Sequence, residues 1–421
     1  MNQSRLNFIS LRLTNIILFV LPLSLALNLI NHYSLDSVFV IFILVGVAWS
    51  IKTQNSLLLN YLNFKESPVN LFFILFFLSG FLGYLFNSPM LEKQWGEILG
   101  LRWIFGFYGA CFFGQFFYKK NGSLALFSLP TLLTLCWLTQ RHLAQNEGRS
   151  FGIDIRFMGF YENTNHYALA FCLLWTYFLG LSFFEKNNKK ALSLSVLTLL
   201  LGLITILATY SRSAWLALVA AFCVAAFYTR KKEPIILGGA VGLILAISIF
   251  MNVFNLKDRI IYSLDTSSFN SQVSRMTVWK VAGQIFLDHP WFGVGFEENV
   301  RKYPEYYKKL GFESEYIVGH AHNQYLEVLS GAGIFGLIGY LGAFITGIVY
   351  FHRRLKVATS NKEKQVALGA ILLIVALMCS SFTDATFRLH EARNYVLLLL
   401  GFSYGYLKTA KSSSFSGSSA I

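Results

Sequence analysis

The feature of this sequence that most constrains its fold is a succession of apolar blocks long enough to cross a lipid bilayer. About 20 apolar residues in a helix are needed to span a hydrocarbon core of roughly 30 Å. Blocks of about this length lie near residues 14–30, 36–51, 69–86, 98–117, 123–138, 166–184, 191–208, 213–229, 235–252, 326–350, 366–382 and 393–407. We therefore expect an all-α integral membrane protein with about 12 transmembrane helices.

The composition excludes an ordinary water-soluble domain. Of the 421 residues, 55% are hydrophobic and only 13% are charged, whereas a soluble domain carries about a quarter charged residues. The first apolar block follows Arg5 and Arg12 and could be mistaken for a signal peptide, but it is long for one and no small-x-small cleavage site follows it. We interpret it as the first membrane helix.

The distribution of Lys and Arg predicts the orientation of the helices, because basic residues accumulate in cytoplasmic loops. With a cytoplasmic N-terminus, every basic cluster falls on the same side of the membrane. The clusters are Lys52 with Lys65, Lys119 with Lys120, Lys186 with Lys189 and Lys190, Arg230 with Lys231 and Lys232, Arg353 with Arg354 and Lys356, and Lys408 with Lys411. Both termini are then cytoplasmic, and the net charge of +14 serves membrane insertion and anionic lipids rather than nucleic acid.

This topology divides the chain into four parts. Residues 1–252 would form helices one to nine, 253–323 a long extracytoplasmic loop, 324–408 the last three helices, and 409–421 a disordered cytoplasmic tail rich in serine. The five cysteines all lie inside apolar blocks without a C-x-x-C pair, so they predict neither a disulfide framework nor a zinc site.

Four polar motifs interrupt the apolar pattern, all on the predicted extracytoplasmic side. The first, G-F-Y-E-N-T-N-H at Gly159–His166, precedes a helix that Asn163 or Asn165 could cap, and a cap is at least as good an interpretation as a ligand contact. The second, T-Y-S-R-S-A, is a tight turn that places Arg212 at the membrane surface. A guanidinium there binds an anion such as a phosphate, or extends to lipid headgroups. Arg102, near the same predicted face, has the same two interpretations, with less support from its sequence context.

The third motif lies in the long loop and begins S-R-M-T-V-W. Apolar residues recur there at helical spacing and predict an amphipathic helix lying against the bundle, which ends at Pro290. The apolar positions are Val273, Met276, Val278, Val281, Ile285 and Phe286. Arg275, in the first turn, would face either a site between loop and membrane or solvent.

The fourth motif, V-G-H-A-H-N-Q-Y-L-E, carries two histidines and an asparagine immediately before a helix. Histidine suits a general base that works near neutral pH. A metal is the alternative, but H-x-H supplies only two ligands and no carboxylate or cysteine partner is evident in the sequence, so we expect none. Gly331, Gly333 and Gly336 would let a neighbouring helix approach closely.

Together, these motifs resemble the O-antigen ligase and O-antigen polymerase superfamily of bacterial envelopes. The resemblance rests on G-F-Y-E-N-T-N, T-Y-S-R-S-A, R-x3-W with H-P-W-F-G-V-G, and H-N followed after nine residues by G-I-F-G, and it covers roughly residues 155–340. It implies an inner-membrane glycosyltransferase that moves a glycan from undecaprenyl diphosphate to an acceptor on the periplasmic face, without metal or other cofactor. The long loop would then be periplasmic.

Carried over from this resemblance, the motif histidine falls on His322, as the base, and the two diphosphate-binding arginines fall on Arg212 and Arg275. His320, Asn323, Arg102 and Asn165 would have supporting roles. A single displacement with inversion is expected, because no acidic residue in these motifs has the role of the nucleophile that retention needs.

Within the superfamily, the H-N-x9-G-x2-G spacing favours a ligase that joins O-antigen polysaccharide to the lipid A–core. A polymerase is the main alternative, with one R-x10-G match from Arg141 to Gly152, and a protein O-oligosaccharyltransferase is the third. From another class, a transporter of lipid-linked glycans would need polar groups through the bilayer midplane and repeated, discontinuous helices. Here the polar motifs gather on one face and no repeat is visible.

Overall fold

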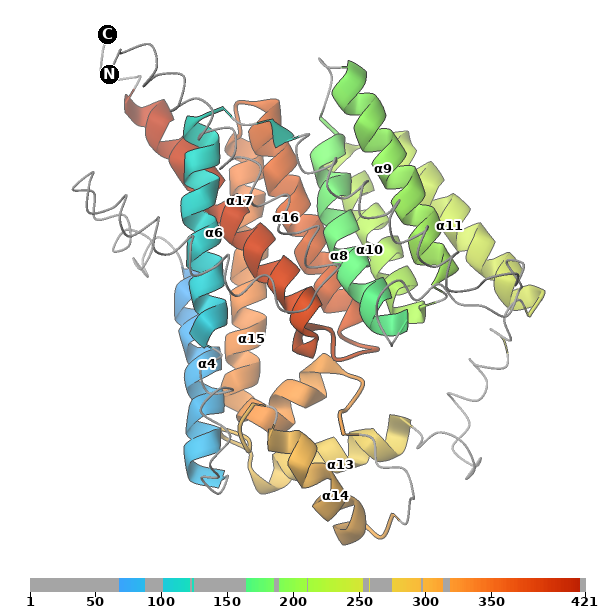
Figure 1. Ribbon diagram of the computed structural model, residues 1–421, viewed down its shortest axis with the longest axis vertical. Helices are drawn as coiled ribbons and strands as arrows, with labels where there is room; N and C mark the ends of the chain where they lie inside the picture. Colours follow the sequence, from blue (N-terminus) through green and yellow to red (C-terminus); the bar gives the residue numbers. More distant parts are fainter. Residues whose placement is uncertain are drawn as a thin grey trace, which may run out of the picture.

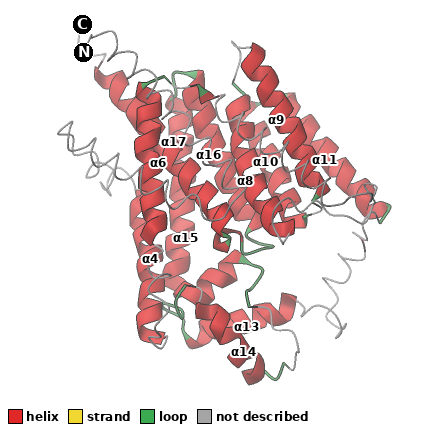
Figure 2. Cartoon of the chain, viewed as in Figure 1, coloured by secondary structure: helices red, strands yellow, loops and turns green. Residues whose placement is uncertain are grey.

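The computed structural model describes residues 68–87, 101–121, 123–124, 164–184, 189–209, 211–252, 257, 275–296, 298–312 and 319–416. In these residues the chain forms helices and no strand (Figure 2). The helices are α4 (Pro68–Asn87), α6 (Leu101–Lys119), α8 (Thr164–Ser182), α9 (Lys189–Ala208), α10 (Arg212–Thr229), α11 (Lys232–Phe250), α13 (Arg275–Asp288), α14 (Glu298–Lys309), α15 (Gln324–Val357), α16 (Asn361–Ser380), the 3-10 helix η3 (Thr386–Arg388) and α17 (His390–Ser416).

The long helices form one bundle, and the short helices α13 and α14 lie together beyond one end of it (Figure 1). α16 packs against α8, α10 and α15, α17 against α6, and α15 against α4. Of the described helices, five are long and apolar enough to cross a membrane, namely α4, α10, α11, α15 and α16. The blocks predicted near 14–30 and 36–51, and nearly all of 123–138, lie outside the described residues, so the count of about twelve stays a prediction.

Burial distinguishes the centre of the bundle from its rim. The membrane-length window of α16 is 78% buried, whereas that of α11 is only 12% buried. On α11 the side chains of Ile235, Ile236 and Leu243 are each more than 60% exposed, at 63%, 65% and 62%. A helix that is apolar on all sides and exposes such residues is typical of a membrane span with hydrocarbon around it.

The described connections that carry basic clusters lie at the end of the bundle away from α13 and α14 (Figure 1). There Lys231 Nζ donates to Phe183 O at 3.0 Å, which joins the α10–α11 connection to the end of α8. Lys362 Nζ donates to Asn121 Oδ1 at 2.7 Å, which joins the start of α16 to the end of α6. These contacts place loops that the charge pattern assigns to one side of the membrane at one end of the protein.

The part of the long loop that the structure describes has its own small core. Amphipathic α13 confirms the predicted helix, and it packs against the start of α15, a helix of the bundle, and against a second loop helix, α14. The core consists of Val278, Val281, Ala282, Ile285, Val294, Tyr303, Tyr306, Tyr307 and Ala321. Met276, predicted on the apolar face, is 46% exposed. The sequence did not predict α14, because its buried face consists mainly of tyrosines that lie between charged residues, so the segment shows no apolar pattern.

α15 is broken at Gly333, where we expected one continuous helix over 326–350. Gly333 has φ +65° and ψ −165°, a conformation that only glycine adopts readily. The turn that follows α13 fills the break through four backbone hydrogen bonds: Val294 N to Ser330 O, Gly295 N to Gly331 O, Ile334 N to Pro290 O and Phe335 N to Trp291 O, at 3.1, 2.8, 2.8 and 3.4 Å. The glycines thus permit a close approach, as predicted, but the partner at Gly331 and Gly333 is this turn and not a helix.

The final helix is longer than expected. α17 continues to Ser416, so the prediction of a disordered tail from residue 409 is wrong over 409–416. The helix does not end where the apolar pattern ends, because Thr409 and Ala410 are still buried, at 8% and 5% exposure. Thr409 Oγ1 also donates to Gly405 O at 2.9 Å, so its hydroxyl is hydrogen-bonded within the helix.

Replacing Gly333 tests the junction between the loop and α15. A Cβ atom at this position would lie 2.3 Å from Trp291 O, so Gly333→Ala should lower the free energy of unfolding by at least about 1–3 kcal/mol from backbone strain alone. Thermal unfolding of the purified protein measures this. Gly242→Ala in α11, where a Cβ meets nothing within 4 Å, is the control and should be neutral or slightly stabilising. Equal melting temperatures for both variants would contradict the account of this junction.

Candidate functional site

The two histidines of the fourth motif lie in the turn that leads into α15. Asn323, the residue before this helix, caps it: its Oδ1 accepts from the backbone N–H groups of Tyr325 and Leu326, at 3.0 and 3.1 Å. Its Nδ2 donates to Phe382 O at 3.1 Å, in the turn after α16. Asn323, predicted to support the site, thus caps the helix and joins the two turns.

The turn brings the two imidazole rings together. His320 Nε2 lies 3.2 Å from His322 Nδ1, and the ring centroids are 4.0 Å apart. His322 has φ +47°, in the left-handed region that non-glycine residues seldom occupy. Backbone conformations of this kind persist only where surrounding contacts impose them, and they concentrate at functional sites.

A carboxylate from a distant part of the chain completes the group. Asp384, between α16 and η3, places Oδ1 3.5 Å from His322 Nδ1, and its side chain is only 7% exposed. The same Oδ1 accepts from Ala385 N at 2.9 Å. A proton on His322 Nδ1 would face this carboxylate, which leaves Nε2 with a free lone pair. This is the arrangement that orients a histidine as a general base.

The protonation of Asp384 follows from its surroundings. Burial by itself would raise the pKa of Asp384, but the hydrogen bond and charge of His322, with the backbone N–H of Ala385, hold the pKa below its usual value. Asp384 therefore carries a negative charge near neutral pH. Burial, followed by the charges of His322 and Arg388, lowers the pKa of His320, so His320 is neutral there.

The helix that begins with Arg212 reaches this group directly. Thr383 Oγ1, next to Asp384, donates to Ser213 Oγ at 2.8 Å. Arg212 is the first residue of α10 and is half-buried. The start of α10 therefore lies beside the turn that carries Asp384.

The loop helix that begins with Arg275 also reaches the histidines. Trp279 Nε1 on α13 donates to Ala321 O, between the two histidines, at 2.9 Å. Arg275 precedes Trp279 by one helical turn and lies on the same face of α13. Of the elements that carry the two predicted phosphate-binding arginines, α13 thus contacts the histidine turn at Ala321, and α10 contacts Thr383, next to Asp384.

Asn165 and Arg102, the other predicted site residues, lie in the first turns of α8 and α6. Asn165 lies in the first turn of α8 and is half-buried. The adjacent His166 is close enough to Asp384 and His322 to interact with them electrostatically. Arg102 is in the first turn of α6, but its side chain lies outside the described residues, as do residues 159–163 and the Arg141–Gly152 match.

Sequence reasoning did not identify Asp384. The signal was present, because the connection between the last two apolar blocks, S-F-T-D-A-T-F-R-L-H-E-A-R, falls on the predicted extracytoplasmic side and holds an aspartate, arginines and a histidine. It was missed because no motif of the resemblance includes it and because it lies 62 residues after His322, a separation that only the helix packing removes.

His320, His322 and Asp384 are also residue types that bind metal ions. Donor atoms of His320, His322 and Asp384 all lie within 4.8 Å of one another, which a metal site also requires. The sequence predicted no metal partly because a carboxylate partner was lacking, and that argument is wrong, since Asp384 supplies one. Within the described residues the group has three members, and their mutual contacts at 3.2 and 3.5 Å also account for them as a hydrogen-bonded acid–base group.

The chain is similar to a known protein family over part of its length. A family model described as O-antigen ligase matches residues 197–341, from α9 to the first half of α15. The match includes Arg212, Arg275, both histidines and the motif glycines at 331, 333 and 336, and it ends before Asp384. It confirms the resemblance to the O-antigen ligase and polymerase superfamily that the four motifs indicated.

Two curated relatives are also similar to the chain. The teichuronic acid biosynthesis protein TuaE of Bacillus subtilis is 26% identical over 274 residues, covering 56% of this chain and 54% of that protein. An uncharacterized protein of Haemophilus influenzae is 25% identical over 230 residues, covering 51% of this chain and 57% of its own length. The chain thus spans little more than half the length of either relative.

Proposed function

We propose that this chain is a glycosyltransferase that moves a glycan from a lipid diphosphate to an acceptor hydroxyl at the membrane surface. In the finer form of the proposal it is an O-antigen ligase, which transfers polysaccharide from undecaprenyl diphosphate to lipid A–core on the periplasmic face of the bacterial inner membrane. The observation that carries the proposal is the His322–Asp384 pair, at the end of the bundle where the helices of Arg212 and Arg275 begin.

In the proposed reaction, His322, Asp384 and the two arginines each have a separate role. The acceptor oxygen attacks the anomeric carbon of the donor sugar, the bond from this carbon to the diphosphate oxygen breaks, and the diphosphate leaves with the electron pair. His322 Nε2 takes the acceptor proton, and Asp384 stabilises the imidazolium that forms. Arg212 and Arg275 neutralise the charge that develops on the leaving diphosphate. No redox step or metal is required.

The burial of Asp384 supports inversion over retention. A retaining mechanism needs a carboxylate that reaches the anomeric carbon as a nucleophile. Asp384 is 7% exposed and its Oδ1 is already engaged by His322 and by the backbone of Ala385. Its position fits a residue that orients the base, so a single displacement is the mechanism that we propose.

The arrangement of the loop supports a site between α13 and the bundle. α13 and α14 lie beyond the end of the bundle that carries the histidines (Figure 1), and α13 contacts the histidine turn through Trp279. In our proposal this end is periplasmic, both termini are cytoplasmic, and the loop covers a donor that enters from the outer leaflet. The acceptor and membrane lipids complete the list of partners.

Two observations bear on the choice between ligase and polymerase. The H-N-x9-G-x2-G spacing favours the ligase, and the matching family model, described as O-antigen ligase, supports the superfamily to which both enzymes belong. The relative named for teichuronic acid biosynthesis keeps a polymerase as the second candidate. Reconstitution with lipid-linked glycan and rough lipopolysaccharide distinguishes them. A ligase yields glycan joined to the lipopolysaccharide, whereas longer glycan on the carrier, with no ligated product, would contradict the ligase proposal.

His322→Ala tests the proposed base. It should lower the rate of glycan transfer by about 10² to 10⁴, because the acceptor hydroxyl loses its proton acceptor, while donor and acceptor still bind. Transfer in proteoliposomes and binding of both substrates are measured side by side. The control is His352→Ala, whose ring bonds the Tyr228 hydroxyl at 2.8 Å on the last turns of α10 and α15. Unchanged transfer by His322→Ala would refute the base assignment.

Asp384→Asn tests the orienting carboxylate. The amide keeps the shape of the side chain but removes the charge that stabilises a protonated His322, so transfer should fall by about tenfold or more with little change in substrate binding. Steady-state kinetics separates the two effects. If KM rose while kcat stayed at the wild-type value, Asp384 would instead be a substrate-binding residue.

Chelation tests the metal-free mechanism. We expect extensive treatment with EDTA to leave the transfer rate unchanged, because the three side chains of the group would act in proton transfer. Metal analysis of the protein before and after treatment accompanies the assay. Loss of transfer with EDTA, restored by a divalent metal and sensitive to His320→Ala, would show that the group is a metal centre.

A further inference from the structure

A second buried carboxylate lies directly behind the histidine turn. Glu327, in the first turn of α15, has a side chain that is only 7% exposed. Its Oε2 accepts a hydrogen bond from Ala321 N at 2.9 Å. Ala321 is the residue between His320 and His322, so this bond holds the backbone of the turn itself.

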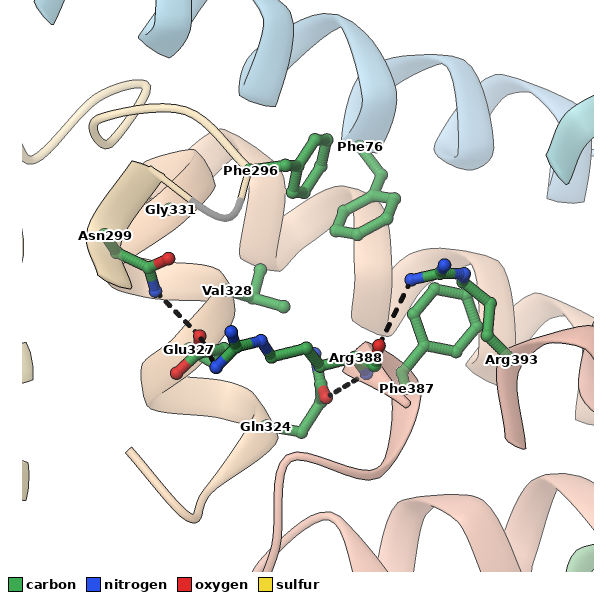
Figure 3. Close-up of a pocket in the computed structure, with 10 residues that line it drawn as sticks. All are labelled: Phe76, Phe296, Asn299, Gln324, Glu327, Val328, Gly331, Phe387, Arg388 and Arg393. Carbon is green, nitrogen blue, oxygen red and sulfur yellow. Dashed lines mark hydrogen bonds and ion pairs between the residues drawn. The ribbon is translucent and has the colours of Figure 1, made fainter. Parts of the chain in front are cut away.

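The other oxygen of Glu327 is held from two further elements. Asn299 Nδ2 on α14 donates to Oε1 at 2.9 Å, and Arg388 Nη1 in η3 lies 3.4 Å from the same atom. Figure 3 shows Asn299 and Arg388 reaching Glu327 from different parts of the chain, beside a cavity whose other wall includes the rings of Phe76 and Phe296. The carboxylate therefore joins the loop, the start of α15 and the segment that follows α16.

The histidine turn is fixed on both sides as a result. Glu327 accepts from the N–H of Ala321, and Trp279 on α13 donates to the C=O of the same residue at 2.9 Å. Arg388 Nη1 also lies 3.4 Å from Gly319 O, one residue before His320. Because the backbone of His322 is in the left-handed region, with φ +47°, local preference would not keep the ring in place and these contacts must do so.

Stability alone does not explain a carboxylate at this position. A buried ion pair can often be replaced by apolar residues of similar volume without loss of stability, because burying charge is costly. The specific property of a carboxylate is two acceptor oxygens in a fixed geometry, which here receive donors from three directions. A first-turn acidic residue also suits the positive end of the helix dipole.

We propose that Glu327 is a positioning residue for His322: by bonding Ala321 N and the side chains of Asn299 and Arg388, it holds the His320–His322 turn in the conformation that aims His322 at the acceptor. This inference rests on the proposed role of His322 as the base. It assigns Glu327 no contact with substrate.

Glu327→Gln is the sharpest test. Glutamine has the same shape, but its amide group must face at least one of the donors from Ala321, Asn299 and Arg388. We expect kcat for glycan transfer to fall by about tenfold or more, while KM for donor and acceptor changes less than about twofold and the melting temperature stays near the wild-type value. An unchanged kcat overturns the proposal.

Glu363→Gln is the matched control. Glu363 is similarly buried, at 8% exposure, and lies in the first turn of α16, where its Oε1 accepts from Ser360 Oγ at 2.8 Å. It is at the far end of α16 from the histidine turn, a helix of 20 residues away. The variant should transfer glycan at the wild-type rate. Equal losses in both variants would show a general effect of removing a buried carboxylate and overturn the proposal.

A double variant separates positioning from a structural role. If Glu327 acts through His322, then Glu327→Gln should cost nothing further in the His322→Ala background. The same fold-loss in both backgrounds overturns the proposal. Should Glu327→Gln fail to fold, Trp279→Phe decides instead, since it removes only the donor to Ala321 O. It should lower kcat severalfold, and an unchanged kcat would overturn the inference.

The outcomes also distinguish this inference from the proposed function. Loss of transfer in His322→Ala with full transfer in Glu327→Gln removes only the role of Glu327. Full transfer in His322→Ala with loss in Glu327→Gln refutes the base assignment, and the action of Glu327 through it. Absence of glycan transfer by the wild-type protein with any lipid-linked donor removes the proposed function itself.

Discussion

The structure depends on the requirement that backbone polar groups within or against a membrane bundle must find partners in the protein. Continuous helices meet this requirement for most of the chain. The break in α15 at Gly333 does not, and it is tolerated because the turn at Pro290–Gly295 supplies the missing partners through Ile334 N, Ser330 O and Gly331 O. The same contacts dock the loop on the bundle, so one break in a helix places α13 and α14 beside the site.

The site lies at the end of the bundle, where buried polar side chains find hydrogen-bond partners. At the end of the bundle, Asp384 and Glu327 are both buried carboxylates, and each engages a different part of the histidine turn, one the ring of His322 and the other the backbone at Ala321. In our proposals the two carboxylates differ in role because they differ in what they face: Asp384 stabilises a proton on His322, whereas Glu327 fixes the conformation of the turn that presents His322.

For the described part of the chain, the apolar blocks predicted the long helices well, because the length of an apolar block reflects the thickness of the bilayer directly. These helices begin and end within about three residues of their blocks, except at the end of α15, the start of α16 and the end of α17. The sequence also predicted α13 and the grouping of polar motifs on one side. What it missed were features set by packing: α14, the break at Gly333, and the extension of α17 past residue 409.

The candidate site shows the same division. His320 and His322 were recognisable as neighbours in one motif; α13, which begins with Arg275, contacts their turn, and α10, which begins with Arg212, contacts Thr383 next to Asp384. Asp384 and Arg388 come from a connection far along the chain, and nothing local to them indicates a partner. Their pairing with His322 and Glu327 is a result of how α16 and α15 pack, through contacts such as Gln324 N to Ser381 O at 2.9 Å.

In our proposal, this end of the bundle holds a lipid diphosphate against an oriented histidine. A cryo-electron microscopy structure of the protein with a non-transferable analogue of a lipid-linked sugar would test this. We expect the diphosphate in contact with the guanidinium groups of Arg212 and Arg275, and the anomeric carbon on the side of His322 Nε2, with Asp384 at Nδ1. A diphosphate bound elsewhere, or a His322 ring turned away from the sugar, would contradict it.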